Sequence, residues 1–145
     1  MNVNKEVWIL AEQRDNELEE ITLELVSEGR KIADKLSAAL CVVIFSERTA
    51  GLTASLAGFD INRIYVINDL PLRDYTVDAY VEALSDLTGE ASPDIVLCGA
   101  TPFGGDIAAG LAARLETGLV SDCIYLDVND DGLLTGTKPV YNDRL

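Results

Sequence analysis

The loop between the apolar run Ile95–Cys98 and an alanine-rich stretch holds the residues best suited to chemistry. A strand, a glycine-rich loop and a helix start are where α/β proteins build ligand sites, because free backbone N–H groups and the helix dipole favour anions there. The candidate residues are Gly99, Thr101, Gly104, Gly105 and Asp106. Phosphate is the ligand class that such a loop would hold.

Two features of the loop argue against a bound nucleotide. No Lys-Ser or Lys-Thr pair follows the glycines, and their spacing differs from that of a dinucleotide fingerprint. Asp106 is also expected in the first turn of a helix over Ile107–Leu115, where its carboxylate would take up the N–H groups that a phosphate needs. We therefore expect Thr101 or Asp106 to cap this helix, Gly104 and Gly105 to permit a tight loop, and no cofactor to bind.

A second constellation is compatible with a phosphoacceptor receiver domain. Glu12, Asp69, Thr101 and the pair Lys138-Pro139 all fall at or near the ends of predicted strands. In a receiver, acids at such positions hold Mg²⁺ for phosphoryl transfer. Here Glu12 is not one of two adjacent acids, and Lys138 follows an extra strand, so this reading is disfavoured.

Nucleophilic catalysis by Ser–His or Cys–His pairs is excluded, because the chain contains no histidine. The cysteines Cys41, Cys98 and Cys123 lie far apart, each among β-type apolar residues. Neither a zinc site nor a redox pair is expected from that spacing. We expect core thiols in a reducing compartment, no metal and no enzyme activity.

The charge and length of the chain limit its number of domains and the classes of partner that it can bind. It has 145 residues, which suits a single domain over 1–145, and its 25 acidic against 11 basic side chains give a net charge of −14. Such a surface repels nucleic acid and anionic membranes. No stretch reaches about 18 apolar residues and no signal region opens the chain, so we expect a cytoplasmic protein without membrane insertion.

Short β-type runs alternate with helical patterns along the chain. The predicted strands are Val7–Ala11, Ala39–Phe45, Arg63–Ile67, Asp94–Cys98, Leu119–Val128 and Leu133–Tyr141. The predicted helices are one ending at Leu36 that starts near either Asn16 or Glu20, a short one within Thr49–Phe59, one over Val77–Leu87, and Ile107–Leu115. The pattern predicts a three-layer α/β sandwich with a doubly wound, mainly parallel sheet and a C-terminal antiparallel hairpin.

Several short motifs of the sequence resemble those of one family. The segments Pro93–Leu97, Gly99–Thr101, Gly104–Asp106, Ala112–Leu115 and Thr117–Cys123 match, in order, motifs of the N-terminal domain of the electron transfer flavoprotein alpha subunit. The opening run Val7–Glu12, the first helix and the runs Ile64–Val66 and Lys138–Tyr141 extend the resemblance over nearly the whole chain.

The resemblance implies an adenine-nucleotide-hydrolase-like fold and a structural role. In that family a heterodimer with a beta subunit carries electrons from flavin dehydrogenases to an acceptor. FAD is held mainly by a second alpha-subunit domain, which is expected to lie outside this chain, so the chain alone is expected to bind no flavin. The chain departs from the family at Gly105, Ala109 and Gly110, where basic residues and a proline are usual. Ion pairs resting on those side chains are therefore in doubt.

The alternative function is a nucleotide-binding domain of the universal-stress or adenine-nucleotide-hydrolase-like class. Retained adenosine phosphate would favour it, and an empty loop would favour the electron transfer reading. We further expect a weak homodimer of the isolated chain, through the small-residue helix Ile107–Leu115 and the strand Leu133–Tyr141.

Overall fold

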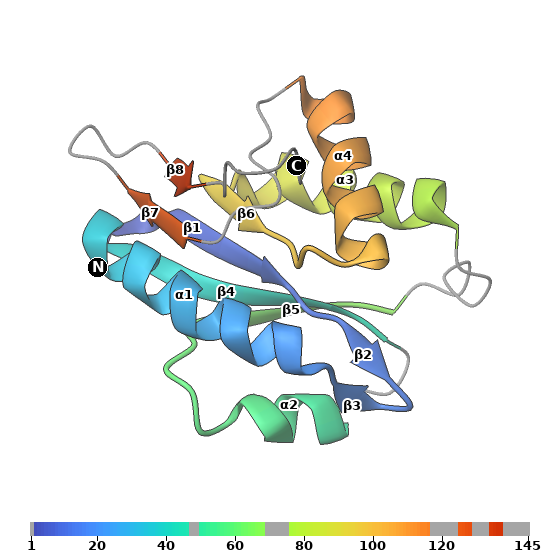
Figure 1. Cartoon of the computed structure of the whole chain (residues 1–145), viewed down its shortest axis with the longest axis horizontal. Helices are drawn as coiled ribbons and strands as arrows, with labels where there is room; N and C mark the ends of the chain where they lie inside the picture. The colour runs from blue at the N-terminus through green and yellow to red at the C-terminus, as the bar shows by residue number, and fades with distance from the viewer. Residues whose placement is uncertain (1, 47–49, 69–75, 117–124, 129–133, 138–145) are drawn as a thin grey trace, which may run out of the picture.

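A parallel sheet forms the centre of the molecule (Figure 1). The computed structural model describes residues 2–46, 50–68, 76–116, 125–128 and 134–137. Within them, β1 (Asn2–Leu10), β4 (Ala38–Phe45), β5 (Arg63–Ile67) and β6 (Ile95–Leu97) make a four-stranded sheet in the order β5-β4-β1-β6. Each neighbouring pair is parallel. The predicted sheet is confirmed.

Helices cover both faces of the sheet. Helices α1 (Glu20–Leu36) and α2 (Ala50–Leu56) lie on one face, and α3 (Val77–Ala91) and α4 (Pro102–Leu115) on the other (Figure 1). Because alternate strand residues point to opposite faces, β1 contributes Ile9 to the core under α1 and Trp8 to the core under α3 and α4. The three-layer prediction is confirmed.

The order of the strands places a topological switch point beside β1. From β1 the chain moves through α1 to β4 on one side, whereas β6 pairs with β1 on the other side. Open α/β sheets bind their ligands where two neighbouring strands lead to opposite sides in this way, at the C-terminal edge. The β6–α4 loop that carries Gly99 and Thr101 lies at that edge.

A small hairpin follows β1 and was not predicted. Strands β2 (Gln13–Arg14) and β3 (Glu17–Leu18) pair antiparallel, and both turn residues between them, Asp15 and Asn16, have positive φ angles of 53° and 64°. Asp and Asn tolerate this left-handed region, which a two-residue hairpin turn requires. Because the hairpin takes up these residues, α1 starts at Glu20, the later of the two predicted positions.

The C-terminal hairpin is confirmed in its central part. Strands β7 (Tyr125–Val128) and β8 (Leu134–Thr137) pair antiparallel, with Val128 opposite Leu134. They form a two-stranded sheet of their own. The remaining parts of the predicted strands Leu119–Val128 and Leu133–Tyr141 lie outside the described residues.

Candidate functional site

Helix α4 starts earlier than the sequence pattern predicted. It begins at Pro102, and Thr101 is its N-cap, with φ −113°, ψ 165° and a side-chain oxygen that accepts a hydrogen bond from the Gly104 N–H at 2.9 Å. Proline at the first helical position after a Ser or Thr cap is a recognised start signal, because that position needs no N–H donor. The prediction had placed the start at Ile107 because the two glycines looked like a loop.

The earlier start changes the roles of three predicted residues. Gly104 and Gly105 lie inside α4 rather than in a tight loop, and Asp106 is exposed beyond the first turn. The expectation that Asp106 stands in the first turn and blocks its N–H groups is therefore wrong. Gly104 still has a steric role, since a Cβ there would overlap the carbonyl oxygen of Gly99, whereas a Cβ on Gly105 would meet nothing within 4 Å.

The anionic group at the switch point is Glu12, two residues after the end of β1 at Leu10. Its residue is only 9% exposed, and both carboxylate oxygens lie 2.8 Å from the Thr101 hydroxyl, which donates to them. A Cβ on Gly99 would come within 2.7 Å of the Glu12 Oε2. Glu12, Gly99, Thr101 and Gly104 thus interlock, and we name these four residues the switch-point cluster.

The backbone of Glu12 is held as firmly as its side chain. Its N–H donates to the Thr22 hydroxyl at 2.8 Å, and that hydroxyl donates to the Glu12 carbonyl at 3.0 Å. The same carbonyl accepts from the Glu19 N–H at 2.8 Å. Thr22 belongs to α1 and is fully buried. One residue therefore joins the end of β1 to α1 through its backbone and to the start of α4 through its side chain.

These contacts leave little for a phosphate group to bind. The Thr101 hydroxyl already donates to Glu12 and accepts from Gly104, the Gly105 N–H donates to the Thr101 carbonyl, and Pro102 has no N–H. The Glu12 carboxylate adds negative charge. Burial, together with that charge, raises the pKa of the neighbouring Cys98 thiol to about 12.

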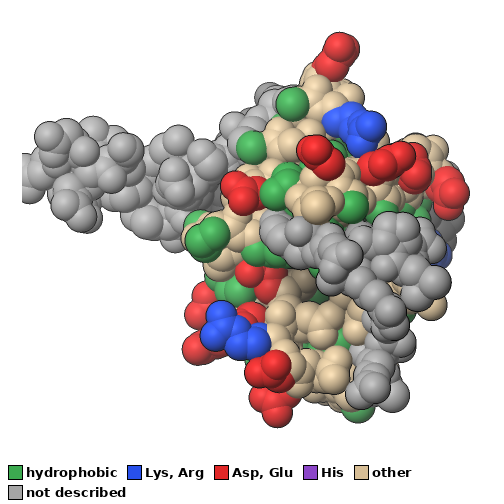
Figure 2. Space-filling view, turned by 90° about the vertical axis from the view of Figure 1, so that its right-hand side faces the viewer, with side chains coloured by type: hydrophobic (Ala, Val, Ile, Leu, Met, Phe, Trp, Pro, Cys, Tyr) green, Lys and Arg blue, Asp and Glu red, His purple; other side chains and the backbone are tan. Residues whose placement is uncertain are grey.

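The surroundings of the cluster are also acidic. Figure 2 looks at the side of the molecule toward which the strands run, and Asp and Glu side chains are spread over it while Lys and Arg are seen at few places. Exposed acids sit on the β2–β3 hairpin and in the first turns of the helices that start at this edge: Asp15, Glu17, Glu20 and Asp78. The exposed Arg14 is paired with Glu19 at 3.3 Å. Such an edge repels phosphate.

The structure brings together part of the receiver-like constellation. Glu12 and Thr101 meet directly, as described. Asp69 and Lys138-Pro139 lie outside the described residues. The contact that is present ties a hydroxyl to a carboxylate, so the Glu12 oxygens are already engaged by the protein itself.

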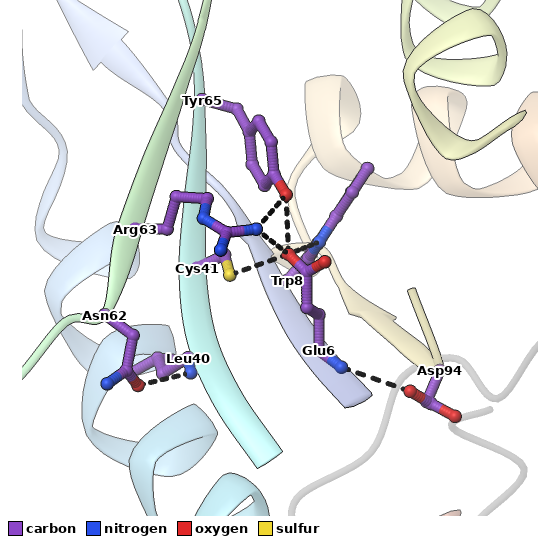
Figure 3. A network of polar contacts seen from close by, with 8 residues as sticks. All are labelled: Glu6, Trp8, Leu40, Cys41, Asn62, Arg63, Tyr65 and Asp94. Carbon is purple, nitrogen blue, oxygen red and sulfur yellow. Dashed lines mark hydrogen bonds and ion pairs between the residues drawn. The ribbon is translucent and has the colours of Figure 1, made fainter. Parts of the chain in front are cut away.

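A second buried acid, which the sequence reasoning missed, lies in the middle of β1 (Figure 3). Glu6 is 6% exposed, and its Oε1 accepts hydrogen bonds from Tyr65 at 2.7 Å, Cys41 at 3.0 Å and Trp8 at 3.3 Å. Arg63 adds an ion pair at 3.5 Å. The backbone of Glu6 exchanges hydrogen bonds with Asp94, which precedes β6. Glu6 therefore touches residues from all four strands or their immediate ends.

The hydrogen bonds around Glu6 set the pKa values of the cluster. Burial raises the pKa of the Glu6 carboxyl, but the bonds from Tyr65, Cys41 and Trp8 and the charge of Arg63 outweigh it, so the pKa falls below its usual value of 4.5. Burial and Glu6 together raise the pKa of the Cys41 thiol to about 12. Cys41 is thus an inert core thiol, as predicted. Cys123 lies outside the described residues.

A signal for this cluster was present in the sequence. Glu6 and Trp8 are two residues apart in a strand and so share a face, and an indole N–H in a core needs an acceptor. The other donors, Cys41 and Tyr65, come from β4 and β5, and their approach depends on the register in which Cys41 pairs with Arg63. That register is not readable from one sequence.

Comparison with known proteins places the chain in a family. Residues 7–145 match the family described as the electron transfer flavoprotein domain. The chain belongs to this family. The Thermoanaerobacterium thermosaccharolyticum "Electron transfer flavoprotein subunit alpha" is 38% identical over 145 residues, covering all of this chain and 44% of that relative. "Protein FixB" of Azorhizobium caulinodans is 38% identical over 97% of the chain and 39% of the relative.

A relative with a different description extends the set. "Acryloyl-CoA reductase electron transfer subunit beta" of Anaerotignum propionicum is 36% identical over 89% of the chain and 35% of its own length. The chain thus spans less than half the length of these electron transfer flavoprotein relatives. Among the described residues, no helix combines the length and apolar character needed to cross a bilayer.

Replacing Thr101 tests the assignment of the helix cap. Thr101→Val removes the cap of α4 and orphans the buried Glu12 carboxylate, so it should lower the free energy of unfolding by about 2–4 kcal/mol. Thr101→Ser should restore most of that loss. Asp106→Ala should leave stability nearly unchanged, as for an exposed surface side chain. Chemical denaturation followed by the fluorescence of Trp8, the single tryptophan, measures all three; a larger loss for Asp106→Ala than for Thr101→Val would contradict the assignment.

The Glu6 cluster predicts a specific dependence of stability on pH. The folded-state pKa of Glu6 is lowered, so its contribution is present above the unfolded pKa of about 4.5 and is lost as pH falls through the folded pKa. Glu6→Gln should cost about 1–3 kcal/mol at pH 7, and the difference from the wild type should shrink in acid.

The matched control is Glu90→Gln, which changes an exposed acid on α3. Urea titrations between pH 7 and pH 3 compare the variants, and Glu90→Gln should keep the acid loss of the wild type. A Glu6→Gln difference that stays constant across this range would contradict a lowered pKa, because it would mean that the pKa of Glu6 is the same in the folded and unfolded chains.

Proposed function

We propose that this chain is the N-terminal, partner-docking domain of an electron transfer flavoprotein alpha subunit. It forms one domain over residues 1–145 and is not itself an enzyme. Two of its relatives are named as electron transfer subunits, and the family match covers residues 7–145. The whole protein would form a heterodimer with a beta subunit in the cytoplasm and carry electrons from flavin dehydrogenases to an acceptor.

One observation favours a structural role for this domain over a ligand-binding role. At the switch point, where this fold class binds ligands, the Glu12 carboxylate is bonded to Thr101 and Thr101 caps α4. In this proposal the residues Gly99, Thr101, Gly104, Gly105 and Asp106 bind no cofactor. FAD is held by the part of the alpha subunit that this chain does not include.

The fold also supports the alternative class, a nucleotide-binding domain. Gly99 and Gly104 bring the start of α4 close to β6, as in sites where a backbone approaches a phosphate. The engaged hydroxyl of Thr101 and the acidic edge weigh against that alternative. We therefore retain it only as the outcome to be excluded by experiment.

The outer face of α4 is the surface best suited to the beta subunit. On its inner side α4 packs closely on α3, where a Cβ on Gly110 would meet Val81 at 2.8 Å. On its outer side Ala109 and Ala113 are exposed, and Leu115 at the end of the helix is 41% exposed. Small side chains allow close approach of a second protein surface. The same face would support a weak homodimer when the chain is isolated.

A bulky charge on this face tests the proposal. Ala109→Arg should weaken binding to the purified beta subunit of the same organism at least tenfold, about 1.4 kcal/mol, because the new side chain stands inside the interface. Ala54→Arg is the matched control on the exposed side of α2 and should bind like the wild type. Titration calorimetry measures the affinities. Failure of the folded wild-type chain to bind the beta subunit would refute the proposed function.

A further inference from the structure

We propose that Glu12 is a built-in occupant of the switch point, and that its carboxylate is the group that excludes phosphate-bearing ligands from this domain. The inference rests on the proposed function in one respect, because the proposed function and the role of Glu12 both require that the native chain binds no nucleotide. It goes further by assigning the exclusion of phosphate-bearing ligands to one residue. The assignment also differs from the expectation based on sequence, which gave this role to Asp106.

The position of the carboxylate carries the argument. Glu12 stands two residues after the end of β1, and Thr101 stands between β6 and α4, so their contact spans the two strands that diverge at the switch point. Both Glu12 oxygens lie 2.8 Å from the Thr101 hydroxyl, and the residue is 9% exposed. Thr101 carries a hydroxyl donor at this edge, beside the start of α4. In the native chain that donor faces a carboxylate of the protein itself.

The shape of the backbone fits this occupant. A Cβ on Gly99 would stand 2.7 Å from the Glu12 Oε2, so the missing side chain of Gly99 leaves the space that the carboxylate fills. Shortening Glu12 would empty that space and leave the Thr101 hydroxyl without its acceptor. A buried donor without a partner costs free energy, which favours uptake of an outside acceptor such as phosphate.

Charge alone would make Glu12 an effective barrier. A phosphate oxygen that bound Thr101 beside the charged Glu12 would lie within about 4 Å of the carboxylate, and repulsion at that distance in a buried setting corresponds to on the order of a hundredfold or more in affinity. Asp106 is exposed and makes no hydrogen bond to Thr101 among the described residues, so its charge acts through water.

Phosphate binding by charge variants tests the inference. Inorganic phosphate and adenosine monophosphate are titrated by calorimetry into the full chain carrying Glu12→Ala, Glu12→Gln or Asp106→Asn, with sodium chloride adjusted to constant ionic strength. Glu12→Ala should bind phosphate at least tenfold more tightly than the wild type. Glu12→Gln, which removes the charge and keeps the size, should gain less. Asp106→Asn should behave as the wild type.

Tighter binding of inorganic phosphate alone would indicate a space that fits only phosphate, and tighter binding of adenosine monophosphate would indicate a wider nucleotide site. Tighter binding of either ligand supports the inference. Circular dichroism establishes that each variant is folded, and Glu12→Gln decides the matter should Glu12→Ala fail to fold. Folded Glu12 variants that bind neither ligand better than the wild type would overturn this inference while leaving the proposed function intact. A gain by Asp106→Asn alone would also overturn it. Binding by the wild type would refute both.

Discussion

The bonded contact between the Glu12 carboxylate and the Thr101 hydroxyl is the constraint on which the candidate site depends. A carboxylate this deeply buried must be hydrogen-bonded, because leaving it without partners costs several kcal/mol. Thr101 meets that need and at the same time caps α4, which sets the start of the helix at Pro102. Gly99 and Gly104 are then required by the close approach that this arrangement imposes.

Two buried acids whose hydrogen bonds are satisfied lie in and just after strand β1. Glu12 links the chain just beyond β1 to α1 and α4, while Glu6 links the middle of β1 to β4, β5 and the residue before β6. The donors to both acids come from this chain, and neither cysteine with a described environment is a reactive thiolate. Polar networks that are satisfied internally fix a unique packing without demanding a ligand. This agrees with the proposed role of the domain, which is to present surfaces to other proteins.

The strands and most helices could be predicted from the sequence, because apolar runs and three- or four-residue spacing report burial directly. Strand β5 and the face of α3 that carries Val81 and Leu84 show how well that works. The start of α4 was missed because glycine has low helix propensity, and a Thr-Pro start followed by two glycines looks like a loop unless the cap is recognised. Glu12 was considered only as a metal-binding acid, and its hydrogen bond to Thr101 was missed. Thr101 lies far away in sequence and meets Glu12 through the pairing of β1 with β6. Tertiary contacts of that kind follow from register, which a single sequence does not specify.

The central claim is that the chain satisfies its own switch point and presents surfaces rather than a cofactor. Native mass spectrometry of the protein, purified without denaturation and without added ligand, tests it most directly. The account predicts the mass of the bare polypeptide, with no stoichiometric nucleotide or flavin. A dominant species heavier by the mass of an adenosine phosphate or a flavin, and returning to the bare mass on denaturation, would contradict it.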